Sequence, residues 1–281
     1  MSLDATSIYW YDGQLGSGST LSLPLQDPAL LYGATVFTTL RIYESRLDHP
    51  WTAWQAHVAR TQRSLHAFGW PTPDWDRLQQ GAATLAPTYP VLRMTIFPDG
   101  RGLILGRSLP PDLAALQAEG AITWVADPLI HKRALSEHKT GNYLSCWLAL
   151  QAARQAGARE AILVNEQGEW LETSTGNLWG WAEGCWWTPP LTAGILPGVL
   201  RSRIVQSLQV RGQTVMMTPW EPAQIAQFTC LAYTNSVVEV VPIRGVLQGA
   251  MSVHYNPDHA KIGELDAAWR SPSPNFSECS G

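Results

Sequence analysis

The chain has 281 residues, of which 45% are apolar and only 15% are charged. The apolar share excludes a disordered chain, because disordered chains lack the side chains needed to bury a core, and the length suits one large or two modest domains. The net charge is −4 and the longest basic run is the pair Lys132-Arg133, so the sequence carries no electrostatic footprint for nucleic acid or an anionic membrane.

The N-terminal part of the chain is predicted to combine short strands with two helices. Apolar segments between turn residues indicate strands at residues 7–10, 20–25, 36–43 and 91–97. Pro50 suits the start of a first helix that ends at Gly69. Its apolar stripe comprises Trp54, Val58, Thr61, Leu65 and Phe68. A second helix is expected at residues 75–85.

The C-terminal part is predicted to begin after the break at Leu109-Pro110-Pro111, with a domain boundary near residues 110–120. We expect helices at residues 142–156 and 199–208. The expected strands lie at residues 121–126, 161–164, 169–171, 178–182, 185–188 and 230–241. The two domains are taken as residues 1–115 and 120–270, and the Ser/Pro-rich residues 271–281 as a flexible tail.

The cysteines and the N-terminus point to a reducing compartment. Widely spaced cysteines at 146, 185, 230 and 279 match neither a metal motif nor a disulfide framework, so no metal is expected. Residues 1–5 lack the basic and apolar regions of a signal peptide, and no apolar run is long enough to span a membrane. We therefore expect a cytoplasmic protein without membrane association.

Lysine is scarce, because only three of the 19 basic residues are lysines: Lys132, Lys139 and Lys261. Lys139 comes just before the predicted helix at 142–156. A solvated lysine is the plainer interpretation, but a helix N-terminus disfavours positive charge. Unlike arginine, a lysine can lose its proton and act as a nucleophile or base. Lys139 is therefore the candidate amine.

A possible ligand loop follows Glu172, which ends a hairpin strand. The residues after it, 173–177, are small hydroxyl residues, Gly and Asn, and such a loop lets backbone approach a ligand. Glu172 is equally compatible with a solvent-facing position. The glycine-bracketed loop 194–198 opens a helix whose free amides suit a phosphate, although Pro and Gly also serve there as punctuation alone.

Three further polar positions are candidates. Thr234-Asn235-Ser236 interrupts an apolar strand, and its side chains either bind a ligand or pair with neighbouring backbone. Arg60, three residues after His57, and Arg101, beside a Gly-Arg-Gly turn, are candidate anion contacts; solvated arginines are the commoner outcome.

The order of these motifs resembles the fold-type-IV pyridoxal-phosphate enzymes. That family comprises branched-chain aminotransferases, D-amino-acid aminotransferases and 4-amino-4-deoxychorismate lyases, and the resemblance spans roughly residues 30–245. The motifs in chain order are His57-Val58-Ala59-Arg60, Lys139-Thr140-Gly141-Asn142-Tyr143-Leu144, Leu171-Glu172-Thr173-Ser174-Thr175-Gly176-Asn177-Leu178, Gly194-Ile195-Leu196-Pro197-Gly198 and Thr234-Asn235-Ser236.

The resemblance implies pyridoxal 5′-phosphate as cofactor and a role for each motif. Lys139 would hold the cofactor covalently and then act as the proton-transfer base. Glu172 would pair with the protonated pyridine nitrogen, and Tyr143 would bond the ring hydroxyl from the same side of an incipient helix. Leu196 would pack on the ring. The phosphate would be held by Arg60, by the amides of Val199 and Leu200, and by Asn235 and Ser236.

Within the family, Phe37-Thr38-Thr39 and Asn235-Ser236 look most like the aminodeoxychorismate lyases. Such an enzyme would eliminate pyruvate from 4-amino-4-deoxychorismate and leave 4-aminobenzoate, a folate precursor. Thr38 would place or protonate the leaving group and Arg101 would contact a substrate carboxylate. Pro98-Asp99 replaces an arginine that the family has before that turn.

Two alternatives remain open. A branched-chain or D-amino-acid aminotransferase would use the same cofactor residues. The 14 tryptophans also suggest a non-enzymatic ligand-binding module, although Trp147, Trp179 and Trp181 fall at core-facing positions, which favours packing.

The resemblance also implies the fold and the assembly. It predicts an α/β and α+β chain with a small N-terminal α/β domain, a larger pseudo-barrel domain and the cofactor in the cleft between them. It further implies a homodimer with the active site near the interface, which the low charge fraction suits.

Overall fold

The protein is described here by a computed structural model that covers residues 8–249 and 251–271. The chain divides into two compact units. Unit 1 consists of Met1–Pro111 and His138–Tyr143, and unit 2 of Asp112–Glu137 and Leu144–Gly281. The segment that carries Lys139 thus belongs to unit 1, although the chain on both sides of it belongs to unit 2. The predicted tail lies outside the described residues, except for Ser271.

Unit 1 is built on a five-stranded antiparallel sheet in the order β2-β1-β5-β4-β3. The strands are β1 Ile8–Tyr11, β2 Gln14–Ser17, β3 Val36–Arg41, β4 Val91–Ile96 and β5 Gly102–Arg107. The predicted strand at 20–25 is wrong. Asp12 and Gly13 form a tight hairpin, both with positive φ, so the partner strand of β1 follows at once.

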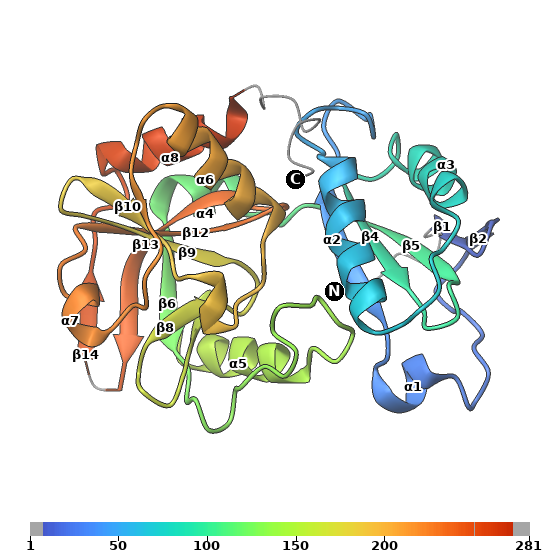
Figure 1. Ribbon diagram of the computed structural model, residues 1–281, viewed down its shortest axis with the longest axis horizontal. Coiled ribbons are helices and arrows are strands. Elements are labelled where there is room, and N and C mark those ends of the chain that lie inside the picture. Colours follow the sequence, from blue (N-terminus) through green and yellow to red (C-terminus); the bar gives the residue numbers. More distant parts are fainter. Residues whose placement is uncertain (1–7, 250, 272–281) are drawn as a thin grey trace. The chain divides into compact units, whose positions relative to one another are not determined.

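Helices α2 Trp54–Ala67 and α3 Trp75–Leu85 lie next to this sheet (Figure 1) and contribute side chains to one core with it. The predicted stripe is confirmed, since Trp54, Val58 and Leu65 are buried in that core. The same core also contains Leu40, Leu92, Met94 and Ile104 from the sheet. Helix α3 matches its predicted bounds, and Asp74 caps it by accepting a hydrogen bond from the Arg77 amide at 2.9 Å. Short α1, Pro28–Tyr32, contributes no buried residue.

Unit 2 is built on a nine-stranded mixed sheet that closes on itself. Strands β9, β12, β13, β6, β7 and β8 pair in that order, and β8 pairs again with β9 through Glu172 and Asn177, which makes the expected pseudo-barrel. The strands of this unit are β6 Ala121–Val125, β7 Glu160–Val164, β8 Trp170–Thr173, β9 Asn177–Ala182, β10 Cys185–Trp187, β11 Val215–Met216, β12 Cys230–Asn235, β13 Glu239–Gln248 and β14 Met251–His254.

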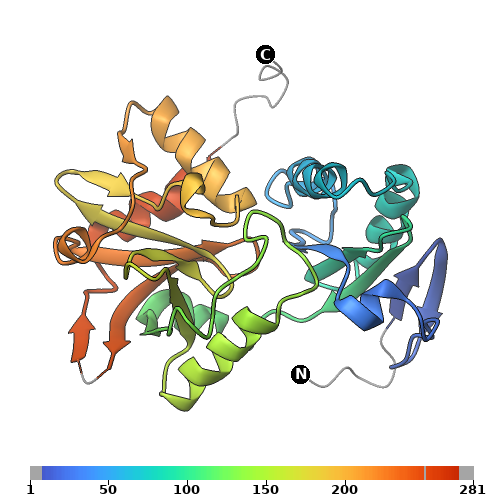
Figure 2. The ribbon, with the colours of Figure 1, turned by 60° about the horizontal axis from the view of Figure 1, so that its bottom comes forward.

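Helices pack on different sides of this barrel. Figures 1 and 2 both show α6 Val199–Val210 and α8 Ala260–Arg270 side by side, with α5 Leu144–Gln155 away from them. Helices α4 Leu113–Glu119 and α7 Pro222–Ile225 and the 3₁₀ turn η1 Leu191–Ala193 complete the unit. Strand β5 and helices α4, α7 and α8 were not predicted.

One predicted strand of unit 2 is wrong in an informative way. The apolar run at 230–241 is two antiparallel strands, β12 and β13, in which Asn235 pairs with Glu239 across a turn of three residues. The run is apolar on both faces because both strands lie in the closed barrel, so periodicity gave no sign of the reversal.

The prediction that Trp147 of α5 faces the core is also wrong. Leu144 and Trp147 are 61% and 53% exposed, whereas the buried side chains of the helix are the small ones, Cys146, Ala149 and Ala153. This helix packs on β7 through its small residues, which allow the close approach.

Among the described residues, none of the helices is both long enough and apolar enough to cross a membrane.

Candidate active site

Lys139 lies on an extended segment that pairs with the start of β3. The Phe37 amide donates a hydrogen bond to the Lys139 carbonyl at 2.8 Å, and the Gly141 amide donates to the Thr35 carbonyl at 2.7 Å. Thr140 forms a β-bridge with Val36. The expectation of an incipient helix at these residues is wrong, because strand pairing occupies their backbone groups and α5 begins only at Leu144.

The Lys139 amine lies among aromatic rings. Its Nζ is 4.9 Å from the Phe37 ring centre and 5.1 Å from that of Tyr143, and the two rings meet edge to face at 5.6 Å. Lys139 and Tyr143 are thus brought together, because both contact Phe37. Helical spacing has no part in this arrangement. Apolar ring faces beside an amine suit a lysine that must lose its proton to react.

A second cation, Arg93 of β4, stacks on the same Phe37 ring, with its Cζ 3.6 Å from the ring centre. Burial, together with the nearby charge of Arg107, lowers the pKa of Arg93 to about 10. A guanidinium whose charge is disfavoured in this way favours the approach of an anion. Sequence reasoning missed Arg93. The available signal was an arginine in the middle of an otherwise apolar predicted strand.

Arg60 and Thr38 are also brought together in unit 1. The Arg60 Nη2 donates to Thr38 Oγ1 at 2.7 Å, and the same hydroxyl lies 2.6 Å from His57 Nδ1. Thr38 is fully buried, since it points from β3 toward α2, whereas its neighbours Phe37 and Thr39 point to the other face of the sheet. This geometry suits Thr38 to holding Arg60 in place.

Arg101 has acidic and phenolic partners within its own unit. It donates to Asp27 Oδ2 and to Asp99 Oδ2, both at 2.6 Å, and it also bonds the Tyr11 hydroxyl. Burial by itself would lower the pKa of Arg101, but the hydrogen bonds to Asp27, Asp99 and Tyr11 raise it above its ordinary value. Two carboxylates therefore already balance the charge that was expected to meet a substrate.

In unit 2, Glu172 of β8 is a buried carboxylate with several donors. Its Oε2 accepts from the Leu196 amide at 3.1 Å and from Asn177 Nδ2 at 3.4 Å, and its Oε1 is paired with Arg133. Asn177 Nδ2 also donates to the Leu196 carbonyl at 2.9 Å. Glu172 and Leu196 are thus joined directly. The solvent-facing alternative for Glu172 is excluded by its burial. Sequence reasoning missed Arg133.

The N-terminus of α6 follows Gly198, and no described side chain caps it. A Cβ at Gly198 would lie 2.0 Å from Asn177 Oδ1, so only glycine permits this close approach. Val199 and Leu200 are the first residues of the helix, as predicted. Their amides are free of side-chain caps and can meet an anion.

Asn235 and Ser236 lie at the turn between β12 and β13. Asn235 Oδ1 accepts from the amides of Val237 at 2.9 Å and Val238 at 3.0 Å, and its Nδ2 donates to Thr175 Oγ1 at 3.3 Å. The sequence left open whether these side chains bind a ligand or pair with neighbouring backbone. These bonds show that Asn235 pairs with the backbone of its own turn. They also fix the turn on which Ser236 stands.

Each unit, taken by itself, presents groups that suit part of pyridoxal 5′-phosphate. Unit 1 supplies an amine, a phenol and a buried arginine in Lys139, Tyr143 and Arg60. Unit 2 supplies the buried carboxylate of Glu172, the uncapped N-terminus of α6 after Gly198, and the polar turn at Asn235 and Ser236. This donor set matches a carbonyl, a pyridine nitrogen and a phosphate.

Comparison with known proteins identifies the family of this chain. Residues 35–246 match the family model described as amino-transferase class IV. Aminodeoxychorismate lyase of Vibrio harveyi is 26% identical over 240 residues, which cover 80% of this chain and 87% of that protein. The branched-chain-amino-acid aminotransferase of Salmonella typhimurium is 24% identical over 261 residues, 84% of each chain.

Solved structures show the same fold. A hypothetical aminotransferase from Mycobacterium tuberculosis, in its PLP-bound form, superposes with a TM-score of 0.79 at 18% identity, covering 93% of this chain and 98% of that one. The family match spans most of the chain and includes the segments of Lys139, Glu172, Leu196 and Asn235. The chain therefore belongs to the amino-transferase class IV family, the fold-type-IV enzymes that use pyridoxal 5′-phosphate.

Proposed function

We propose that this protein is a 4-amino-4-deoxychorismate lyase, which releases pyruvate from its substrate and forms 4-aminobenzoate. When bound, pyridoxal 5′-phosphate supplies an electron sink for the carbon that carries the substrate amine. Lys139 removes the proton from that carbon, and the C–O bond to the enolpyruvyl group breaks with its electron pair on oxygen. That oxygen takes up a proton and the enol becomes pyruvate, so the reaction needs no oxidant.

We further propose how the chain holds the cofactor. Lys139 binds it covalently, Tyr143 bonds the ring hydroxyl, Glu172 pairs with the pyridine nitrogen and Leu196 packs on the ring. The phosphate is held by Arg60, the amides of Val199 and Leu200, and Asn235 with Ser236. Each of these assignments rests on the family motif at that position and on the donor or acceptor that the residue presents.

The lyase assignment is carried by Phe37-Thr38-Thr39 and Asn235-Ser236, which look most like the aminodeoxychorismate lyases, and by the likeness to the lyase of Vibrio harveyi. Lys139 and Arg93 both contact the Phe37 ring, so two cations line this part of unit 1. They suit a substrate that carries a carboxylate, as both aminodeoxychorismate and an amino acid do. We therefore assign the carboxylate contact to Arg93, because Arg101 is engaged with Asp27 and Asp99.

The position of Thr38 bears on the leaving group. Its hydroxyl bonds His57 and Arg60 on the α2 side of β3. Thr39 pairs with Arg93 in the sheet, and both side chains lie on the face that Phe37 shares and Thr38 does not. The Thr39 hydroxyl can therefore reach a substrate on the Phe37 side. We assign the contact with the leaving group to Thr39 and the support of Arg60 to Thr38.

A branched-chain or D-amino-acid aminotransferase is the second candidate. It is favoured by the identity to the aminotransferase of Salmonella typhimurium, which nearly equals the identity to the lyase of Vibrio harveyi. The two reactions share the cofactor residues and differ in whether a second, 2-oxo acid substrate is used.

A product assay separates the two reactions. We expect the protein with pyridoxal 5′-phosphate to convert 4-amino-4-deoxychorismate into equal amounts of pyruvate and 4-aminobenzoate. Turnover of an amino acid with a 2-oxo acid, without any aminobenzoate, would contradict the lyase and support the aminotransferase.

The lysine is tested independently of the substrate. We expect the protein to bind the cofactor with the yellow colour of a lysine-bound aldehyde, which borohydride bleaches and fixes to the chain. K139A should lose both properties, whereas K132A and K261A should retain them. A colourless wild-type protein would instead support a non-enzymatic ligand-binding module.

A further inference from the structure

The turn between β12 and β13 ends in an unusual backbone conformation. Glu239 has a φ of +61°, in the left-handed region, directly after the three turn residues Ser236, Val237 and Val238. Three-residue hairpin loops place a left-handed residue at this position, and glycine or asparagine is preferred there because a Cβ is strained. A glutamate at this position therefore needs a compensating use of its side chain.

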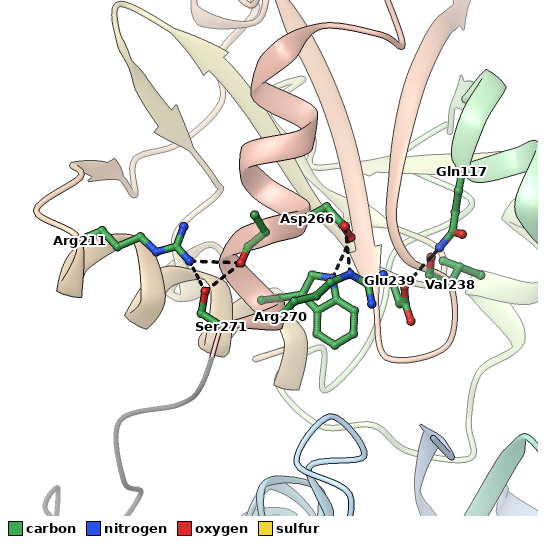
Figure 3. A network of polar contacts seen from close by, with 9 residues as sticks. Gln117, Arg211, Val238, Glu239, Asp266, Arg270 and Ser271 are labelled. Atoms are coloured by element: carbon green, nitrogen blue, oxygen red, sulfur yellow. Dashed lines mark hydrogen bonds and ion pairs between the residues drawn. The ribbon is translucent and has the colours of Figure 1, made fainter. Parts of the chain in front are cut away.

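The Glu239 side chain is buried and paired. Its Oε2 accepts from Arg270 Nη2 of α8 at 2.5 Å. Arg270 is held in turn by Asp266, whose Oδ2 accepts from Nε at 3.0 Å. Burial by itself lowers the pKa of Arg270, but Asp266 and Glu239 raise it above its ordinary value. Figure 3 shows Arg270 lying between the two carboxylates.

Helix α4 holds the same turn from another side. Gln117 Nε2 donates to the Val238 carbonyl at 3.0 Å and lies 3.5 Å from Glu239 Oε2 (Figure 3). The C-terminal end of the turn is thus tied to two helices, through one backbone carbonyl and one carboxylate.

The N-terminal end of the turn is tied to a second buried carboxylate. Asn235 Nδ2 donates to Thr175 Oγ1, and the hydroxyls of Thr175 and Ser174 bond the carboxylate of Glu160 at the start of β7. Each end of the Ser236–Val238 loop is therefore anchored through a buried carboxylate, that of Glu160 or that of Glu239.

We propose that Glu239 is a positioning residue for cofactor binding: through Arg270 and Gln117 it fixes the turn that presents Ser236 to the cofactor phosphate. The proposal rests on the phosphate contact of Asn235 and Ser236 proposed above. A turn held in one conformation before the phosphate arrives loses less freedom on binding, and this raises the affinity for the phosphate specifically.

A second glutamate in unit 2 provides a matched control. Glu183, in the turn between β9 and β10, also has a left-handed φ, of +52°, but it is exposed. Glycine relieves backbone strain at both positions. Only at position 239 does the change also remove a buried carboxylate that pairs with Arg270.

The experiment compares binding of pyridoxal 5′-phosphate with binding of pyridoxal, which lacks the phosphate, by the absorbance of the lysine-bound form. We expect E239G to bind pyridoxal 5′-phosphate at least about tenfold more weakly and pyridoxal within about twofold of wild type. E239Q, which keeps an acceptor oxygen without the charge, should show a smaller loss of the same kind. E183G should change neither affinity.

Folding is monitored by the thermal midpoint of the apo protein. Arg270 retains Asp266 in E239G, so no buried charge is left alone and the midpoint should remain close to that of wild type. Equal weakening toward both ligands, or no weakening toward either, would overturn the proposal. Failure of wild type to form 4-aminobenzoate would overturn the lyase reaction alone and leave this result standing.

Discussion

The buried polar side chains of unit 1 form a directional chain of donors and acceptors. Arg60 can only donate, so Thr38 Oγ1 accepts from it, and the same hydroxyl is hydrogen-bonded to His57 Nδ1. A neutral His57 ring can complete this bond without placing a third cation beside Arg60 and Lys139. Burial holds the pKa of His57 well below its usual value, and the charges of Arg60 and Lys139 act in the same direction.

The neutral His57 makes stability depend on pH. Because its pKa is depressed in the folded state, the unfolded chain binds an extra proton below about pH 6.5. The stability due to a neutral His57 is thus full above that pH and is lost as the pH falls. In denaturant titrations we expect the free energy of unfolding to lose about 1.4 kcal/mol per pH unit in this range from His57 alone.

The H57N variant isolates this contribution. The Asn Oδ1 still accepts from Thr38 but does not titrate, so the difference between wild type and H57N should narrow as the pH falls from 7 toward 5. H66N is the control on the same helix, because His66 is exposed. Parallel pH profiles for wild type and H57N would mean that His57 is not held neutral.

At the scale of elements, the pairing of residues 139–141 with β3 determines where the candidate lysine lies. This pairing is close, since a Cβ at Gly141 would come within 2.1 Å of Thr35 Oγ1 and 2.8 Å of the Gly33 carbonyl oxygen. The Thr35 hydroxyl can rotate away, but the Gly33 carbonyl belongs to the backbone, so that collision is relieved only if one of the two chain segments moves.

The G141A variant tests this pairing. We expect a loss of about 1–3 kcal/mol in the free energy of unfolding, as for an overpacked site, together with weaker cofactor binding through Lys139. G263A on α8 is the control, because nothing lies near its added Cβ and helix propensity favours alanine. Urea unfolding and cofactor titration measure both effects. Equal stability of G141A and wild type would show that the segment is loosely held.

The elements that could be predicted are those with a clear local pattern. The stripe of α2 and the bounds of α3 follow from a period of 3.6 residues and from Asp74 as a cap. The division of 230–241 into β12 and β13 does not have such a signal, because burial on both faces erases the alternation of polar and apolar residues. Strand β5 is buried only at alternate positions, but its half-buried positions include Leu103 and Leu105, so its sequence lacks the alternation as well.

At the scale of the whole molecule, the tryptophans and the exposed apolar residues have separate roles. Trp179, Trp186, Trp220 and Trp269 are fully buried, and Trp186 meets both Trp179 and Trp181 edge to face. These residues pack the interior of unit 2. By contrast, Leu144, Trp147 and Leu148 leave an apolar surface on α5. Surfaces of this kind mark sites of protein association.

We propose that α5 contributes to a homodimer interface. Oligomers are typical of the family, and the low content of charged residues suits an apolar interface between two subunits. We expect wild type to sediment as a dimer and W147E to shift toward monomer, because the introduced carboxylate would be buried without a partner. V210E, at an exposed apolar position of α6, should remain a dimer. Identical sedimentation of W147E and wild type would exclude α5 from the interface.

The sequence by itself determined the family, the cofactor and the order of the candidate residues, because these depend on short motifs whose chemistry is local: an amine, a carboxylate and a glycine before a helix. Only the tertiary structure decided which side chains meet. It placed Lys139 and Arg93 against the same Phe37 ring, paired Arg101 with two aspartates, and paired Glu239 in the turn with Arg270. The physical reason is that such contacts follow from strand register and from pairing between residues far apart in the chain, and these do not leave a periodic signal in the sequence.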